Sequence, residues 1–353
     1  MSIERIEVQP GYSISRVIKG GWHLAGGHGA VDESQAIEDM RAFVERGITT
    51  FDCADIYTGV EEMIGKFLKK FKSNFTSGDL PSVQIHTKYV PDYNALSSLT
   101  KKDTEDIINR SLKRLNVERL DLVQFAWWDF KIPGYIEVGQ HLADLQKQGK
   151  IRYIGVTNFN GKYLKEMLDA EIPIVTNQVQ YSVLDLRPER DLQKLANANK
   201  IFLLCYGVVA GGFLSDRYLS TSEPTEPFEN RSLVKYKLII DEFGGYDLFQ
   251  QLLNVLGTIG KKYNVGITEV ASRYILQKQT VAGIIIGVRN QNHLARLLKL
   301  SSFNLDNEDF EMIHNVTSKA QGPKGPVYEL EGLKEGKHGS IMRYNLNKQR
   351  DAN

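Results

Sequence analysis

The sequence has little of several features that would assign it to a special class of protein. It has only two cysteines in 353 residues, and neither stands in a metal-ligand spacing, which excludes a disulfide framework and a cysteine metal site. Its 44 basic and 43 acidic residues leave a net charge of +1, so no general attraction to nucleic acid or to an anionic membrane is expected. No apolar run approaches the roughly 18–20 residues of a membrane span, and residues 1–5 lack the apolar core of a secretory signal. We therefore expect a cytoplasmic protein without nucleic-acid or membrane partners.

Short β-branched segments instead alternate with helical patterns along most of the chain. The expected strands are 14–19, 49–54, 83–89, 120–127, 151–158, 174–181, 201–208 and 281–288. The expected helices are 33–46, 61–71, 101–115, 135–148, 161–169, 189–199, 248–263, 268–277 and 292–300. Strict alternation around eight strands predicts an α/β fold, a (β/α)8 TIM barrel. An open doubly wound sheet is the alternative, but no G-x-G-x-x-G pattern opens a helix after the first strand.

Two segments do not fit the simple alternation. Residues 210–246, rich in Gly, Ser, Pro and Glu, are too long for an ordinary connection and indicate an extended loop after the seventh barrel strand. Residues 321–353 show little apolar periodicity, which fits either a frayed terminus or a segment folded over the barrel mouth. The predicted organisation is one barrel domain over 1–320, followed by a tail.

Polar residues occur at strand ends, where the chemistry of such barrels collects. The second strand ends in Asp52, with Tyr57 five residues later, and the third ends in Lys88. A lysine in a buried strand needs a partner, and an aspartate on the neighbouring strand end could provide it. A nearby ammonium would also lower the pKa of Tyr57 and suit it to proton transfer. The spacing alone is equally consistent with a purely structural ion pair.

Five sequence blocks favour a functional site over a structural ion pair. Through these blocks the chain resembles the aldo-keto reductase superfamily over about residues 5 to 300. The matching blocks are Asp52-x-Ala54-x-x-Tyr57, Thr87-Lys88, Gly155-Val156-Thr157-Asn158-Phe159, Asn177-Gln178-Val179-Gln180, and the segment from Tyr206-Gly207 to Gly211-Gly212. The segment Gln124-Phe125-Ala126-Trp127-Trp128-Asp129 looks like one bacterial, fungal and plant branch of the superfamily.

The resemblance implies a role for each matching residue. Tyr57 would be the general acid, with Lys88 and Asp52 setting its pKa. Thr157, Asn158 and Gln178 would hold the nicotinamide carboxamide, and Tyr206 would stack on its ring. The remaining expected contacts of the cofactor are Gly21, Trp22, Asp52, Gly207, Val209, Gly211, Gly287, Arg289 and His293.

The sequence departs from the family pattern at Ala126, which stands where the family has its fourth catalytic residue, a histidine. Alanine can neither donate to a carbonyl oxygen nor exchange a proton, and a positioned acid–base group is typically worth about 10²–10⁴ in rate. Three interpretations stay open: an engineered knock-out, a natural enzyme that needs only Tyr57, or a homologue that has lost reduction. Related enzymes that reduce conjugated double bonds also lack this histidine.

The segment after the eighth strand points to NADPH as the cofactor. Gly287-Val288-Arg289 resembles the family's pattern around the 2′-phosphate, and a helix N-terminus there would add backbone donors. His293 and Arg296 would add positive charge, and no acidic residue falls between 287 and 300.

The substrate is predicted only by class. Aromatic residues fall at or near strand ends, namely Trp22, Tyr57, Tyr89, Trp127 and Trp128, with Phe130. Aromatic walls suit an apolar or aromatic carbonyl compound better than a sugar or a charged acid. Reduction of a carbonyl or conjugated double bond is the leading hypothesis. The alternatives are a non-redox isomerase, dehydratase or cyclase on the same scaffold, and a cofactor-sensing binding subunit. No metal site is predicted.

Overall fold

Eight parallel strands close into a barrel in the computed structural model, which describes residues 3–26, 29–288 and 290–347. The strands are β3 (Val17–Gly20), β4 (Thr50–Asp52), β5 (Gln84–Tyr89), β6 (Leu120–Ala126), β7 (Ile151–Thr157), β8 (Ile174–Gln180), β9 (Phe202–Tyr206) and β10 (Val281–Ile286). They pair in chain order, and β10 pairs with β3 to complete the ring. The predicted (β/α)8 barrel is confirmed.

A hairpin precedes the barrel, and here one expected boundary is wrong. The segment predicted as a single strand over 14–19 belongs to two strands, because β2 (Tyr12–Ser15) pairs antiparallel with β1 (Arg5–Gln9) and β3 starts only at Val17. Tyr12 and Ile14 of the hairpin pack with barrel residues such as Leu122. The hairpin therefore closes the end of the barrel where the strands begin.

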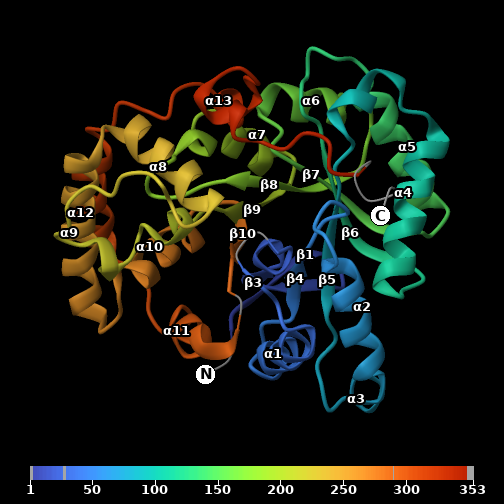
Figure 1. The fold of residues 1–353 in the computed structure, drawn as a ribbon, viewed down its shortest axis with the longest axis horizontal. Helices are drawn as coiled ribbons and strands as arrows, with labels where there is room; N and C mark the ends of the chain where they lie inside the picture. Colours follow the sequence, from blue (N-terminus) through green and yellow to red (C-terminus); the bar gives the residue numbers. More distant parts are fainter. Residues whose placement is uncertain (1–2, 27–28, 289, 348–353) are drawn as a thin grey trace.

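Helices surround the strands, as Figure 1 shows. Their apolar faces pack on the barrel, and local caps set their ends; Thr100 and Asp103, for example, form a capping box at the start of α4. The helices are α1 (Glu33–Glu45), α2 (Val60–Lys70), α3 (Lys72–Ser77), α4 (Lys101–Leu115), α5 (Tyr135–Lys147), α6 (Gly161–Asp169), α7 (Leu192–Ala198), α8 (Arg231–Phe243), α9 (Tyr246–Tyr263), α10 (Ile267–Leu276), α11 (Leu294–Lys299), α12 (Asn307–Thr317), α13 (Glu329–Gly332) and α14 (Lys337–Ser340). Within the described part of the chain, none of them has both the length and the hydropathy to cross a membrane.

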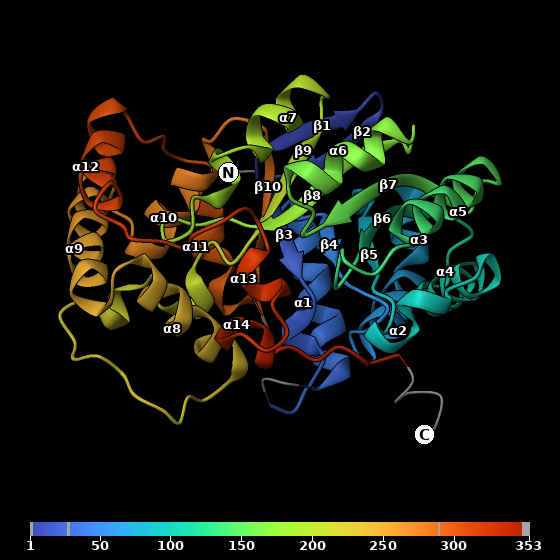
Figure 2. The same ribbon diagram turned by 90° about the horizontal axis from the view of Figure 1, so that it is seen from above.

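The two irregular segments of the sequence both carry helices. The loop after β9 contains α8, which the sequence did not predict, and the tail contains α13 and α14. Figure 2 shows α14 beside α8. The tail also contacts loops that follow barrel strands: Glu331 pairs with Arg187 after β8, and the Asn347 backbone amide donates to Asp92 after β5. The tail therefore lies across the end of the barrel where the strands finish, which we call the mouth.

Candidate active site

A buried ion pair joins two neighbouring strands at the mouth. The Nζ atom of Lys88 at the end of β5 lies 2.6 Å from Oδ2 of Asp52 at the end of β4, and it also donates to the Cys53 carbonyl at 2.9 Å. Both side chains point into the barrel because alternate residues of a strand share a face. Burial, the largest single effect, would lower the pKa of Lys88, but the charge and hydrogen bond of Asp52 together with the charge of Tyr57 outweigh burial and raise it. Lys88 is therefore a fixed cation.

Two glutamine side chains complete this network. The amide nitrogen of Gln178 donates to Oδ1 of Asp52 and to Oε1 of Gln124, each at 2.7 Å, and that of Gln124 donates to the same Asp52 oxygen at 3.1 Å. Asp52 therefore accepts hydrogen bonds on both oxygens. Gln124 was missed among the predicted site residues, although its place in a buried strand, two residues before Ala126 and on the same face, is a detectable signal.

Tyr57 lies beside this pair. The Lys88 ammonium is 5.0 Å from the centre of the Tyr57 ring, and the indole of Trp22 packs edge-on against the ring with their centres 5.1 Å apart. Burial raises the pKa of the Tyr57 phenol, while the charge of Lys88 opposes that rise. The predicted effect of Lys88 is thus present, but burial outweighs it and the phenol keeps its proton.

On the opposite side of the mouth, residues of β7, β8 and β9 lie close together. The Tyr206 hydroxyl donates to Oδ1 of Asn158 at 2.9 Å, and the Thr157 hydroxyl donates to the Gln178 carbonyl at 3.0 Å. With the described residues, the side-chain nitrogen Nδ2 of Asn158 and the side-chain oxygen Oε1 of Gln178 make no hydrogen bond. One donor and one acceptor therefore remain for a ligand.

Several predicted glycines are required by close packing. A side chain at Gly21 would come within 2.7 Å of the Asp52 carbonyl oxygen, and one at Gly287 would overlap the His23 ring. Gly207 and Gly211, on either side of Val209, both have positive φ and both contact Tyr236 of α8. These glycines bring the loops after β3, β9 and β10 close to the mouth.

The residues predicted for the 2′-phosphate are only partly placed. Arg289 lies outside the described residues. His293 is exposed, whereas Arg296 forms a bidentate ion pair with Glu269 of α10, at 2.7 and 2.9 Å. The expectation that Arg296 adds positive charge is therefore wrong, because Glu269, distant in sequence, compensates it.

The predicted aromatic wall is also smaller than expected. Ala126 is half-buried at the end of β6. Tyr89 and Trp127 each follow an inward-facing residue and pack instead in the core around Phe125, 1% and 2% exposed. Phe130 stacks on Tyr163 of α6. Tyr89 and Trp127 therefore do not face the mouth, and their prediction as substrate contacts was wrong.

Trp128 differs from its neighbours in the same segment. Its indole nitrogen donates to the Pro91 carbonyl at 2.7 Å, and its ring packs against Tyr344 of the tail. Trp22 and Trp128 thus remain as aromatic residues near the mouth, both beside elements that follow barrel strands.

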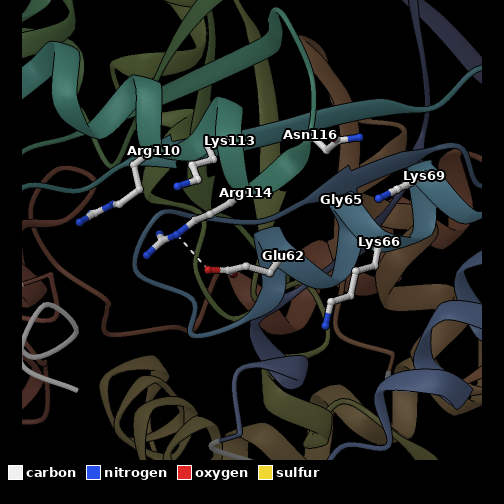
Figure 3. A pocket seen from close by; sticks show the side chains of 8 residues that line it. All are labelled: Glu62, Gly65, Lys66, Lys69, Arg110, Lys113, Arg114 and Asn116. Atoms are coloured by element: carbon white, nitrogen blue, oxygen red, sulfur yellow. Dashed lines mark ion pairs between the residues drawn. The ribbon is translucent and has the colours of Figure 1, made fainter.

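A separate groove of about 470 Å³ lies between α2 and α4, outside the barrel. Figure 3 shows Lys66 and Lys69 projecting from α2 and Arg114 reaching towards Glu62, with which it pairs at 2.9 Å. None of the predicted site residues lines this groove. The described ranges hold no group of three or more His, Cys, Asp or Glu side chains arranged for a metal ion. The mouth is therefore the candidate active site.

Comparisons with known proteins identify the family of the chain. A model of the Aldo/keto reductase family matches residues 16–318. The chain is 28% identical to the aldo-keto reductase YhdN of Bacillus subtilis over 336 residues, covering 92% of this chain and 97% of that protein. It is 26% identical to the chloroplastic pyridoxal reductase of Arabidopsis thaliana, covering 93% and 89%.

A solved structure extends the comparison to the fold. The glycerol dehydrogenase AKR11B4 of Gluconobacter oxydans superimposes with a TM-score of 0.75 at 21% identity, covering 93% of this chain and 99% of that one. Since the family model spans most of the barrel, with Asp52, Tyr57 and Lys88 inside the matched range, the chain belongs to the aldo/keto reductase family.

Proposed function

We propose that this protein is an NADPH-dependent oxidoreductase that reduces the carbonyl, or a conjugated double bond, of an apolar or aromatic small molecule. The observation that carries the proposal is the buried Lys88–Asp52 pair, 2.6 Å apart, beside Tyr57 at the barrel mouth. A buried charge pair is weak evidence for stability, whereas perturbed groups gathered beside a tyrosine at strand ends are typical of a functional site.

The residues on the β7–β9 side fit a nicotinamide. When bound, this cofactor supplies a hydride. A carboxamide offers one N–H₂ group and one carbonyl, and the Gln178 oxygen and the Asn158 nitrogen are the acceptor and donor left over at that place. The Tyr206 ring, held by its hydroxyl to Asn158, would provide a flat surface for the nicotinamide ring.

Tyr57 would donate the proton that the substrate oxygen takes up. Its high pKa keeps the proton on the phenol until the oxygen becomes basic. Lys88 would then stabilise the phenolate that remains, because its own charge is held by Asp52 and does not depend on the reaction. Ala126 offers no second donor, so the whole proton transfer depends on Tyr57.

Turnover experiments test this proposal directly. The purified protein is mixed with NADPH and a series of aromatic aldehydes, ketones and conjugated enals, and loss of the reduced-nicotinamide absorbance is followed. Ala126→His is tested beside it, and we expect the histidine to raise carbonyl reduction about 10²–10⁴-fold. Product formation without NADPH oxidation would instead indicate a non-redox enzyme. Tight NADPH binding without turnover in either form would indicate a sensing subunit.

The choice of NADPH over NADH has its own test. Dissociation constants for both are measured by quenching of intrinsic fluorescence, for the wild type and for Arg289→Ala. We expect tighter NADPH binding in the wild type and a loss in the variant that is larger for NADPH than for NADH, because a guanidinium binds phosphate through charge-assisted hydrogen bonds. Equal wild-type affinities would contradict the cofactor assignment without affecting the reaction.

The aromatic class of the substrate is supported by relatives as well as by Trp22 and Trp128. One relative is named a pyridoxal reductase, which acts on an aromatic aldehyde. If only short polar aldehydes are reduced in the screen, the class preference is wrong.

A further inference from the structure

Lys235 of α8 lies at the mouth, on the side opposite Tyr57. Its Nζ atom is 4.8 Å from the centre of the Tyr206 ring. The next residue, Tyr236, packs its hydroxyl on Gly207, which follows Tyr206 directly. The amino group of Lys235 therefore lies over the ring that we propose as the nicotinamide platform.

This ammonium is held without a direct partner. With the described residues, Lys235 makes no ion pair within 4.0 Å and no hydrogen bond, although it is half-buried. Lys237, two residues further along the same helix, does have ion-pair partners: Asp241 at 2.5 Å and Glu223 at 2.8 Å.

The acidic groups that influence Lys235 are already occupied. Asp185 and Glu331 each bind Arg187 through two hydrogen bonds of 2.7 to 2.9 Å, and all three side chains are no more than 2% exposed. Burial has the largest effect on the pKa of Lys235 and lowers it, and the charge of Arg187 also lowers it. The charges of Glu331 and Asp185 raise this pKa, but the net result is a lowered value. The carboxylates of this cluster thus attract the Lys235 ammonium, but they accept none of its N–H groups because Arg187 already binds them.

A half-buried ammonium whose donors have no acceptor is costly. A carboxylate is its best acceptor, since charge-assisted hydrogen bonds are about twice as strong as neutral ones. Trp22 and Tyr57, across the mouth, offer aromatic surface to the remainder of a ligand.

We propose that Lys235 binds a carboxylate of the substrate, so that the protein prefers aromatic carbonyl compounds that carry an acidic group. This inference rests on the proposed function, because it places the substrate between Tyr57 and the nicotinamide that would stack on the Tyr206 ring. It also departs from the sequence-based expectation, which favoured an apolar or aromatic compound over a charged acid.

Two matched aldehydes test the inference: para-formylbenzoate and its methyl ester. We expect the wild type to show a KM for the carboxylate about ten- to a hundredfold lower than for the ester, from one charge-assisted hydrogen bond. Lys235→Met should remove that preference, so that the KM values for the carboxylate and the ester differ by less than about twofold. Lys237→Met is the control and should keep the preference. Lys235→Arg should keep most of it.

A binding measurement separates this inference from the proposed function. Terephthalate, which has no carbonyl to reduce, is titrated calorimetrically into the wild type and Lys235→Met, each saturated with NADP⁺. Binding that weakens about tenfold or more in the variant supports the inference even if neither aldehyde is turned over. If the ester is reduced but the carboxylate is not preferred, the proposed function stands and the inference is wrong. An altered NADPH dissociation constant in Lys235→Met with unaltered terephthalate binding would assign the lysine to the cofactor and overturn it too.

Discussion

The two ends of the barrel bury polar side chains on the same strands but use them differently. Near the hairpin, the side-chain oxygen of Gln84 accepts from Arg5, Thr49 and Thr50, and its nitrogen donates to the Ser82 carbonyl. Four residues further along β5, Lys88 instead meets a carboxylate and lies beside Tyr57. The first arrangement uses the hydrogen-bonding capacity of Gln84 on the protein itself.

At the mouth, by contrast, some hydrogen-bonding groups are not used within the protein. Among the described residues, the side-chain nitrogen of Asn158, the side-chain oxygen of Gln178 and the Lys235 ammonium have no hydrogen-bond partner. Unsatisfied groups lower stability unless a ligand uses them. The difference teaches that Gln84 at the hairpin end serves the fold, whereas the polar residues at the mouth are available to what binds there. Substitutions at matched positions of the two ends can break or sharpen that distinction.

The largest expected difference is in activity, between variants of a tyrosine at the mouth and of one at the hairpin end. Tyr57→Phe removes the proposed acid, so kcat should fall about 10²–10⁴-fold with NADPH binding unchanged. Tyr12→Phe, at the hairpin end, removes a hydroxyl that lies 3.0 Å from Nε2 of the buried His86, and it should cost about 1 kcal/mol of stability with activity retained. Turnover with an aromatic aldehyde and urea unfolding check both variants. Equal activities in the two variants would contradict the proposed role of Tyr57.

The second expectation concerns the free energy of unfolding. Lys88→Met leaves Asp52 buried without its cation and should cost about 3–5 kcal/mol. Lys101→Met breaks an exposed pair with Asp144, 2.7 Å apart, and should cost less than about 1 kcal/mol. Urea unfolding followed by circular dichroism measures both. Adding Asp52→Asn to Lys88→Met should recover part of the loss. If the single variant is as stable as the wild type, the pair is not the costly buried charge that the geometry indicates.

The sequence predicted the barrel and the ion pair for a physical reason. Both depend on local periodicity and on the rule that parallel strands finish at one end, which places Asp52 and Lys88 together. The same rule would have corrected Tyr89 and Trp127, since a residue next to an inward-facing one must face outward.

The remaining errors depend on contacts between distant segments. The charge of Arg296 is compensated by Glu269, which is 27 residues away. Lys235 sits in a segment whose composition indicated only a loop. Periodicity within one segment carries no information about such partners.

The smallest expected effect is a dependence of stability on pH at the hairpin end. Burial, with a smaller contribution from Lys88, lowers the pKa of His86 from 6.5 to about 3. Between these values the unfolded chain binds a proton that the folded chain does not, so the free energy of unfolding falls as the pH falls. The slope is at most about 1.4 kcal/mol per pH unit. The raised pKa of Lys88 has the opposite consequence, because its stabilisation is full below the ordinary lysine pKa and is lost only as the pH rises through the raised value.

His86→Gln isolates the contribution of the histidine, because an amide can still hydrogen-bond to Tyr12 but does not titrate. Urea unfolding of both proteins at several pH values between 6.5 and 4.5 should show a shallower decline for the variant. The carboxylates common to both proteins contribute equally, so the difference between the two slopes reports His86 alone. Parallel slopes would mean that His86 titrates alike in the folded and unfolded chains, and its burial beside Tyr12 would then not distinguish the hairpin end from the mouth.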